Sequence, residues 1–504
     1  FGVNRRSLSD SAYNVVQAGY TTNNPAGLGL GENYLLSTFG RLNYSFGGKY
    51  FLSGNVRKDE YSALGVKSNT FYGVSAGWEL GKEKFWTNAG IDKVFNSFKL
   101  RGSYGKVGNL AGIGNYATFS TYGSGLYGGN PTLNFSGIGN PDIQWETSTK
   151  TDIGVNMGFF NGRLTADVAY YKNDIDNLLL NVPQSPSTGI PGGAVFQNVG
   201  AMYNKGIELT ITATPIETKN FTWNTSFNFS SNKNEVTKLA PGLNEIITAT
   251  SGLETINKTV VGKSAGYLWV VRTAGVDPQT GKRIFLNGAG EKIYYQFGTV
   301  LPAGQYNYSY ADGTQYKKNG IPAAINQADD AVLYKNAQPK YYGGWDNTWT
   351  YGGFDLNVLL TYQFGSWIYY GSNAGLRDQR FWNNSTDVLR YWQKPGDITD
   401  IPKPVYNDNV SNGGTPIDVN VFKGDFVKLR TVQLGYSLDK VELKKISINS
   451  IRFYVAAQNL AIFSKYPGPD PEVSANGNSA TSPGVDRNTL ANGRTITVGV
   501  NVNF

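Results

Sequence analysis

The final residues of the chain, Arg494-Thr-Ile-Thr-Val-Gly-Val-Asn-Val-Asn-Phe504, decide its fold class because apolar and polar side chains alternate there without a break. Successive side chains of an extended strand point to opposite faces, so one face of this segment is apolar and ends in an aromatic residue. That face consists of Ile496, Val498, Val500, Val502 and Phe504. A soluble sheet buries such a face against a second layer, whereas a membrane barrel turns it to lipid and closes on itself. This segment alone fits both architectures.

The same alternation recurs along the chain, each time with one apolar face and one face of Thr, Asn, Ser or Asp. In the segment 221–230, for example, Phe221, Trp223, Phe227 and Phe229 alternate with small polar residues. Lipid requires the first kind of face and a polar lumen requires the second. The pattern predicts about thirteen strands, near 36–46, 49–58, 69–80, 97–107, 147–157, 162–172, 204–214, 221–232, 341–350, 354–367, 424–438, 449–460 and 493–504.

The connections between these strands alternate between short and long. Short connections are predicted at 47–48, 82–95, 159–162, 215–219, 351–353 and 439–445. The others are mostly long, at 108–146, 173–203, 233–340, 368–423 and 461–492, and only 59–68 is brief. A soluble sandwich has no reason to sort its loops in this way, but a barrel combines short periplasmic turns with long extracellular loops. The sequence therefore predicts an all-β fold, a transmembrane antiparallel β-barrel in a bacterial outer membrane.

The composition excludes several classes of function. The 504 residues include no Cys and no His, which removes disulfides, thiolate metal sites, His-dependent triads and the commonest metal ligand. We therefore expect no enzyme activity, no metal site and no cofactor. The net charge of +8 is spread thinly, so we expect no nucleic-acid partner. No apolar run reaches the roughly 18 residues of a membrane helix.

An odd number of strands raises the question of how the barrel closes. An open wall would leave two edges in lipid, and each unpaired backbone group there costs several kcal/mol. We therefore expect either an N-terminal part beyond the given sequence or another chain to complete the wall.

Seven segments have more specific sequences than strand alternation requires. They are Leu100-Arg-Gly-Ser-Tyr-Gly-Lys-Val-Gly-Asn109, Asn140-Pro-Asp-Ile-Gln-Trp-Glu-Thr-Ser-Thr-Lys150, Asp152-Ile-Gly-Val-Asn-Met-Gly-Phe-Phe-Asn-Gly-Arg-Leu164, Asn198-Val-Gly-Ala-Met-Tyr-Asn-Lys-Gly-Ile-Glu-Leu209, Pro339-Lys-Tyr-Tyr-Gly-Gly344, Phe453-Tyr-Val-Ala-Ala-Gln-Asn-Leu460 and Lys465-Tyr-Pro-Gly-Pro-Asp-Pro-Glu472. These segments occur in the same order as in the SusC/RagA family of TonB-dependent outer-membrane transporters, and the chain resembles this family from about residue 36 to 504.

This resemblance implies a larger protein. Family members are 22-stranded barrels of about twice this length, so residues 1–504 would be the C-terminal portion of the barrel, without the plug domain and the N-terminal strands. It also implies import of glycans, oligosaccharides or peptides into the periplasm of Bacteroidota. The implied partners are a SusD-like surface lipoprotein that closes over the barrel as a lid, and TonB, which would act through the missing N-terminal part.

Aromatic, amide and charged side chains in two predicted extracellular loops are the candidate ligand-binding residues. Aromatic faces beside amides suit sugars or peptides, and charged groups can add charge-assisted hydrogen bonds. The candidates are Asp378, Arg380, Trp382, Asn383, Arg390, Tyr391 and Trp392 in the loop 368–423, and Tyr122 and Tyr127 in the loop 108–146. The alternative is that these side chains hold the loops together or contact the lid.

Aromatic residues near strand ends on the short-turn side indicate a girdle at the membrane interface. These residues are Trp78, Phe85, Trp86, Trp349 and Phe504. Their predicted role is structural anchoring.

Two acidic motifs elsewhere predict loop structure and no site. Asp277-Pro-Gln-Thr-Gly-Lys282 has too few carboxylates for Ca²⁺ and predicts a Pro-led turn. Asp329-Asp330 is interpreted as a solvated loop end, because a catalytic pair needs a buried cleft.

Three other functions remain open at this stage. A barrel of this kind could be a passive pore or a structural subunit of a larger envelope complex. An outer-membrane enzyme is disfavoured by the absence of His, and a soluble adhesin built of sandwiches would need no detergent for its extraction. The sequence does not identify the substrate.

Overall fold

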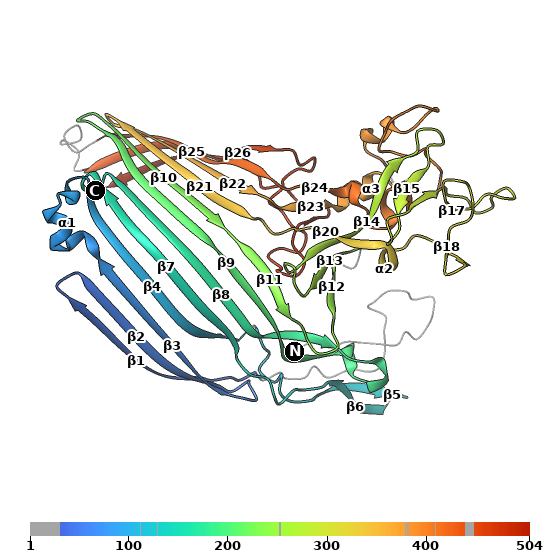
Figure 1. Cartoon of the computed structure of the whole chain (residues 1–504), viewed down its shortest axis with the longest axis horizontal. Coiled ribbons are helices and arrows are strands. Elements are labelled where there is room, and N and C mark those ends of the chain that lie inside the picture. Colours follow the sequence, from blue (N-terminus) through green and yellow to red (C-terminus); the bar gives the residue numbers. More distant parts are fainter. Residues whose placement is uncertain are drawn as a thin grey trace.

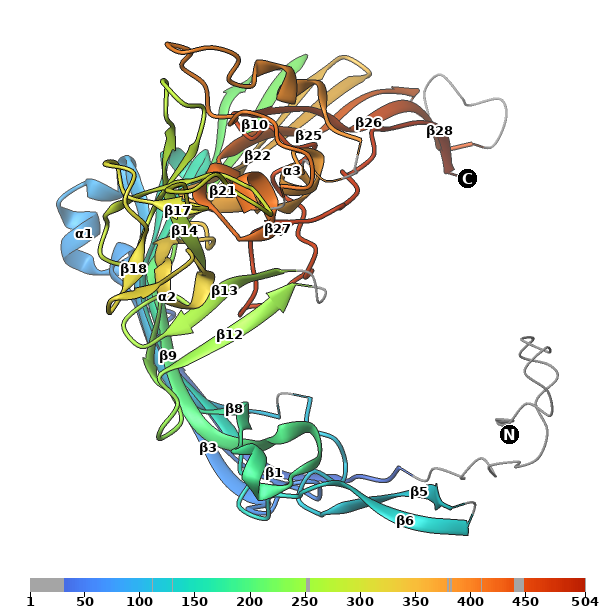
Figure 2. The ribbon, with the colours of Figure 1, turned by 90° about the vertical axis from the view of Figure 1, so that its right-hand side faces the viewer.

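Long strands form a curved wall, and a folded domain lies beyond one end of it (Figure 1). The computed structural model describes residues 31–110, 112–128, 130–250, 254–378, 380, 383–408, 410–438 and 448–503. Figure 2 shows the wall from the end of its strands, as an open arc that runs from β1 to β28. Among the described residues no helix is long and apolar enough to cross a membrane.

The wall is a fourteen-stranded antiparallel sheet within the described residues. Across the sheet, in order, its strands are β1 (Leu35–Phe46), β2 (Tyr50–Tyr61), β3 (Ser68–Glu79), β4 (Phe95–Asn109), β7 (Glu146–Phe159), β8 (Leu164–Pro183), β9 (Ala194–Glu217), β10 (Phe221–Ser231), β21 (Tyr341–Tyr351), β22 (Phe354–Phe364), β25 (Phe426–Leu438), β26 (Ser450–Ser464) and β28 (Thr495–Asn503). A short strand, β11 (Lys233–Lys238), pairs with residues 201–205 of β9. The predicted strands are confirmed, including the C-terminal one, although Phe504 lies outside the described residues.

The two faces of the wall have opposite chemistry because the strands are paired in register. Tyr44 faces Leu52 across β1 and β2, and Val455 faces Val498 across β26 and β28. Val498 is 75% exposed, so no protein layer covers this apolar face there. A barrel turns such a face to lipid, and the alternate side chains then line the lumen. We call these the outer face and the luminal face.

One end of the wall carries tight turns, as predicted. Gly47 and Gly48 join β1 to β2 with φ values of 58° and 63°, the left-handed conformation that glycine adopts at little cost. The other turns contain η4 (Phe160–Gly162) and, between β3 and β4, η2 (Leu80–Lys82), α1 (Lys84–Asn88) and η3 (Ile91–Lys93). The predicted turn at 439–445 lies outside the described residues.

The prediction of a long connection at 173–203 is wrong. β8 and β9 continue through most of this segment as a paired hairpin, which contains η5 (Pro186–Thr188) and η6 (Pro191–Gly193) near its tip. The apolar alternation ends at Lys172, Asp174 and Asp176, where the outer face becomes charged. Backbone pairing does not need an apolar face, so the strands extend beyond the point where the sequence pattern stops.

The other long connections fold into compact structures. The segment 108–146 contains the hairpin of β5 (Thr121–Tyr127) and β6 (Asn130–Gly137). The described residues of 239–340, 365–425 and 465–494 together build what we call the loop domain, on the right in Figure 1.

The loop domain contains three small sheets within the described residues. The first comprises β12 (Glu245–Thr250), β13 (Glu254–Val260), β14 (Tyr267–Val276), β15 (Arg283–Leu286), β16 (Lys292–Tyr295), β17 (Tyr308–Ser309) and β20 (Ala331–Lys335). The second comprises β18 (Lys317–Lys318) and β19 (Ile321–Pro322), and the third comprises β24 (Val421–Lys423), β23 (Trp367–Tyr370) and β27 (Val485–Asp486). Its short helices are α2 (Gln327–Asp330), α3 (Gly371–Leu376), η7 (Thr386–Arg390), η8 (Val410–Gly414) and η9 (Asp418–Asn420).

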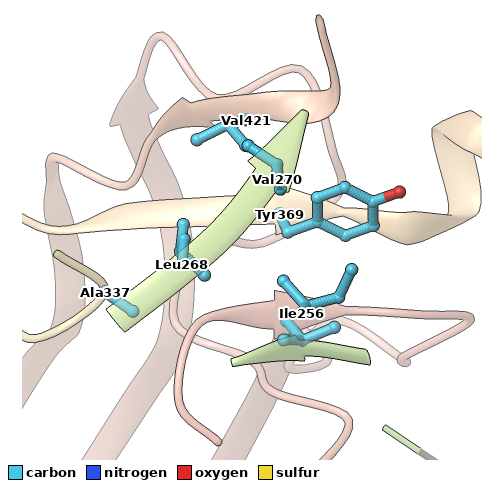
Figure 3. Close-up of a cluster of buried hydrophobic side chains, with 7 residues drawn as sticks. Ile256, Leu268, Val270, Ala337, Tyr369 and Val421 are labelled. Atoms are coloured by element: carbon cyan, nitrogen blue, oxygen red, sulfur yellow. The ribbon is translucent and has the colours of Figure 1, made fainter. Parts of the chain in front are cut away.

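Residues from all three connections share one hydrophobic core. Figure 3 shows Leu268 and Val270 of β14 clustered with Ile256 of β13 and with Tyr369 and Val421 from the second connection. Val485 of the third connection completes this cluster. Leu268 and Val270 have no exposed surface, so the loop domain is held together by its own buried apolar side chains.

Candidate functional site

The luminal face carries charged pairs that cross neighbouring strands. Arg101 of β4 donates to Asp152 of β7 and, at 2.9 Å, to Asp167 of β8. The guanidinium reaches over Gly154, where an added Cβ would lie 2.7 Å from its Cζ atom. A larger residue at this position would displace the guanidinium, so glycine leaves room for the arginine to cross the strand.

A second pair at the other side of the wall has the same construction. Arg452 of β26 donates from Nε to Asp355 Oδ1 of β22 at 3.0 Å. The pair passes over Gly435 of β25, where an added Cβ would lie 2.4 Å from the Asp355 carboxylate. These pairs give the lumen a polar, hydrogen-bonding surface of both charge signs.

An ion-pair network joins the luminal face to the loop domain. Lys428 of β25 is fully buried and contacts Asp470 at 3.1 Å and Glu472 at 2.6 Å. Glu472 also accepts from Arg430, and Asn492 donates to Asp470 at 3.2 Å. A buried ammonium is stable only with such partners, so this network fixes the connection 465–494 to the wall.

A second buried cation holds two parts of the loop domain together. The Arg283 side chain has no exposed surface, and it donates to the backbone oxygens of Ser411 at 3.0 Å and Asp400 at 2.8 Å. Burial lowers the pKa of Arg283 to about 10, with nearby carboxylates opposing the shift. Arg283 therefore remains charged at neutral pH, and its hydrogen bonds hold the segment around residue 283 against the segment 400–411.

The loop 368–423 contains a cluster of alternating charges. Arg377 is buried and contacts Asp387 and, at 3.1 Å, Asp400. Arg390 contacts the same two carboxylates from outside, and its side chain is 61% exposed. Arg390 therefore keeps surface available to a ligand, whereas Arg377 holds the cluster in place.

The other candidates in this loop have different surroundings. Asp378 is buried and accepts two hydrogen bonds of 3.0 Å from Arg380. Trp392 is 7% exposed, and its indole nitrogen donates to Pro278 at 2.8 Å inside the loop domain. Asn383 is exposed and Tyr391 is half-buried. Trp382 lies outside the described residues.

The two tyrosine candidates lie on a separate element. Tyr122 and Tyr127 belong to β5, and they are 65% and 84% exposed. Tyr122 has its ring centroid 5.7 Å from that of Phe135 on β6. The hairpin therefore presents an exposed aromatic surface.

The tryptophans at the short-turn end contact their turns. Trp78 stacks on Tyr50 with ring centroids 6.4 Å apart, and its indole nitrogen donates to Glu83. Trp349 stacks on Trp223 at 6.3 Å, and both lie on the outer face. Trp86 donates to the backbone oxygen of Phe95 at 2.8 Å. The three tryptophans therefore lie at the short-turn end of the wall, where the apolar outer face ends.

The structure confirms the prediction for one of the two acidic motifs and only half of the prediction for the other. Asp277 to Lys282 forms a turn, as predicted, in which the Gly281 amide donates to the Asp277 carbonyl. The interpretation of Asp329-Asp330 as a solvated loop end holds for Asp329 but is wrong for Asp330. The Asp330 carboxylate is buried because it accepts from the backbone amides of Gly288 and Asn326.

Sequence reasoning missed the charged residues that organise the site. The partners of Arg101, Arg283, Lys428 and Arg452 are distant along the chain, whereas Arg377 meets Asp387 and Asp400 within its own loop. Two usable signals were the segments 100–109 and 152–164, which contain Arg101 and its partner Asp152, and the segment 465–472, whose Asp470 and Glu472 hold Lys428, was another.

A comparison with family models identifies the family from the first half of the chain. The model of the TonB dependent receptor-like β-barrel matches residues 1–269, more than half of the chain. TonB-dependent receptor P26 of Formosa agariphila is 30% identical over 522 residues, covering 100% of this chain and 48% of the relative. TonB-dependent receptor SusC of Bacteroides thetaiotaomicron is 25% identical, covering 94% of this chain and 44% of SusC. The chain thus spans about half the length of the curated relatives it matches.

The fold comparison agrees with the family match. The structure of the RagAB peptide importer in its closed-closed state superposes with a TM-score of 0.76 and 25% identity, covering 98% of this chain and 50% of that one. The similarity includes the loop domain as well as the wall, because nearly the whole chain is covered. The chain belongs to the TonB-dependent receptor family, as a β-barrel of the bacterial outer membrane that is similar to SusC and RagA.

Proposed function

We propose that this chain is the C-terminal portion of the barrel of a SusC-like nutrient importer. The observation that carries the proposal is the polar luminal face of the wall, tied through Lys428 to a folded extracellular domain. A polar lumen suits a hydrophilic cargo, and a rigid domain above it can position binding side chains. Residues 1–504 would supply thirteen of about 22 strands, and the plug and N-terminal strands would belong to the rest of the protein.

The proposed cargo is a glycan, an oligosaccharide or a peptide. Arg390 and Asn383 on the loop domain and Tyr122 and Tyr127 on the β5–β6 hairpin offer exposed charged, amide and aromatic groups, and the half-buried Tyr391 lies next to Arg390 in the chain. Such groups bind sugars and peptides through stacking and hydrogen bonds. Asp378 and Trp392 would support these side chains from within the loop. Trp78, Trp86 and Trp349 would anchor the barrel at the periplasmic interface.

The proposed partners follow from the relatives. One solved relative is named as the RagAB peptide importer, and several curated relatives are named as TonB-dependent receptors. By analogy, a SusD-like lipoprotein would close over the loop domain, and TonB would act through the plug. The runner-up function is a barrel that does not pump, used as a passive pore or as a structural subunit.

Transport by the full-length protein tests the proposal. The native polypeptide is first extracted in detergent, and its intact mass and N-terminal peptides are determined. Cells that express it with its lipoprotein partner are then given labelled oligosaccharides and labelled peptides, with and without TonB. We expect uptake of one class to require TonB and to fall about tenfold or more in Y122A/Y127A or R390A, because aromatic and charged anchors dominate binding. Tyr406, which is 82% exposed on the loop domain, provides the control Y406A.

Two results would overturn the proposal. Uptake that is unchanged without TonB would favour the passive pore, and no uptake of either class would favour the structural subunit. Equal losses in Y406A and in the candidate variants would show that the chosen residues are not the ligand site.

A further inference from the structure

A cavity of about 650 Å³ lies on the outer face of the wall, where the strands meet the loop domain. Its lower wall consists of Tyr170, Ile207 and Tyr341, which are 42%, 49% and 46% exposed. Its upper wall includes Lys205, Lys233, Lys263 and Lys340. The cavity therefore combines an apolar floor on the lipid side with a strongly basic rim.

Three lysines of this region stand side by side across neighbouring strands. Lys172 of β8 is directly opposite Lys205 of β9, and Lys205 is directly opposite Lys233 of β11. Figure 1 shows these three strands together at the loop end of the wall. Like charges directly opposite each other destabilise a sheet. A row of three lysines is thus an arrangement that needs negative charge nearby.

The protein supplies only part of that charge. Lys172 contacts Asp174 at 2.8 Å and Lys233 contacts Glu235 at 2.8 Å, whereas Lys205 makes no ion pair among the described residues. All three ammonium groups lie within 6 Å of the centre of the Tyr203 ring, at 5.9, 5.1 and 5.8 Å. The uncharged Tyr203 ring attracts these cations but does not cancel their charge, and Lys263 and Lys340 add two more cations at the rim.

The height of the row matches the extracellular edge of the membrane. Below it, the outer face of β8 is apolar at Leu164, Ala166 and Val168, and it becomes charged at Lys172. A membrane strand needs about 9–11 residues to cross the hydrocarbon layer, which is the distance from Leu164 to Lys172. Lys340 immediately precedes β21, so it lies at the same level. The lysines therefore lie where the headgroups of the outer leaflet begin.

We propose that this cavity binds the phosphate-bearing headgroup of an outer-leaflet lipid. The lysine row and rim would pair with the phosphates, and the acyl chains would continue down the apolar floor along Tyr170, Ile207 and Tyr341. Free phosphate has the same charge but no use for an apolar floor that opens onto lipid. The proposal depends on the orientation of the wall in the membrane and not on the transported cargo.

Lipid binding to the full-length protein in detergent tests this proposal by native mass spectrometry. The probes are a diphosphorylated lipid A and the same lipid after removal of its phosphates. We expect the wild type to retain the phosphorylated lipid and the variant K172Q/K205Q/K233Q to bind it roughly a hundredfold more weakly, since each lysine near an anionic lipid contributes about a factor of five. The charge-matched control is K292Q/K317Q/K394Q, which removes three exposed lysines of the loop domain.

Three outcomes would overturn the proposal. They are equal binding of the two lipids by the wild type, an equal loss in the control variant, and full displacement of the lipid by inorganic phosphate at the same concentration. The last outcome would assign the site to a free anion. The comparison of the two lipids uses only wild-type protein, and K172R/K205R/K233R should retain binding, so a folding defect of the glutamine variant cannot decide the result.

Discussion

The wall and the loop domain use the same apolar residue types for opposite purposes. In the wall, Val498 and Leu42 are 75% and 73% exposed on the protein surface, because lipid serves as their second layer. In the loop domain, Leu268 and Phe285 have no exposed surface, because protein covers them on every side. An apolar side chain therefore stabilises the wall by contact with lipid and the loop domain by contact with other buried side chains. Substitutions should therefore separate the two regions.

The largest effect is expected at the junction between the two regions. K428M removes the buried ammonium and leaves the Asp470 carboxylate without its ion-pair partner, although Asn492 still donates to it. Breaking a buried pair costs about 3–5 kcal/mol, so we expect the connection 465–494 to become protease-sensitive while the wall stays folded. The control K428M/D470N removes both charges and should recover part of the loss. Equal protease resistance of K428M and the wild type would mean that the junction does not depend on this pair.

The core of the loop domain should be the next most sensitive place. L268A removes a side chain with no exposed surface, and large-to-small core changes cost about 2–5 kcal/mol. We expect proteolysis throughout the loop domain and an unchanged heat-modifiable barrel band on electrophoresis. The control is I398A, because Ile398 is 94% exposed in the same domain. A simultaneous loss of the barrel band would show that wall and loop domain unfold as one unit.

The same contrast explains how much of the molecule was predictable. A wall strand has one apolar and one polar face, so its period is visible in the sequence, and the C-terminal strand β28 was predicted from that period. The prediction failed at 173–203 because strand pairing there continues without a lipid-facing pattern. β14 contains the buried run Leu268, Trp269, Val270 and Val271, which shows no alternation.

The candidate site was less predictable because it depends on contacts between distant residues. Arg283 meets the backbone of Asp400 and Ser411, more than a hundred residues later in the chain. Its burial could not be expected, since an arginine in a loop is usually exposed. Aromatic residues in the loops could be found by composition alone, but composition does not separate the buried Trp392 from the exposed Tyr127.

The two faces of one strand provide a test within the wall. V498K places a charge on the outer face of β28, whereas T497K places the same charge on the luminal face one residue away. A lysine facing lipid near the bilayer centre costs about 2–4 kcal/mol, and a luminal lysine costs little. Urea unfolding of the full-length barrel in lipid vesicles should show this difference. Equal destabilisation by both variants would contradict the assignment of the faces.

The smallest effect is expected at the periplasmic turn, where the half-buried Glu83 carboxylate lies close to solvent and is partly screened by it. Hydrogen bonds from Tyr50, Lys49 and Trp78 lower the pKa of Glu83 to about 2. A group whose pKa is lowered by folding stabilises the fold above its ordinary pKa of 4.5, and that contribution is lost as the pH falls toward 2. The variant E83Q lacks the charge at every pH.

The difference in melting temperature between the wild type and E83Q should therefore be present at pH 6.5 and should shrink between pH 4.5 and 2. Fluorescence-detected melting of the detergent-solubilised protein across this range provides the measurement. E217Q is the matched control, since Glu217 is exposed at the end of β9 on the same side of the wall. A difference that does not change with pH would assign the role of Glu83 to its shape and not to its charge.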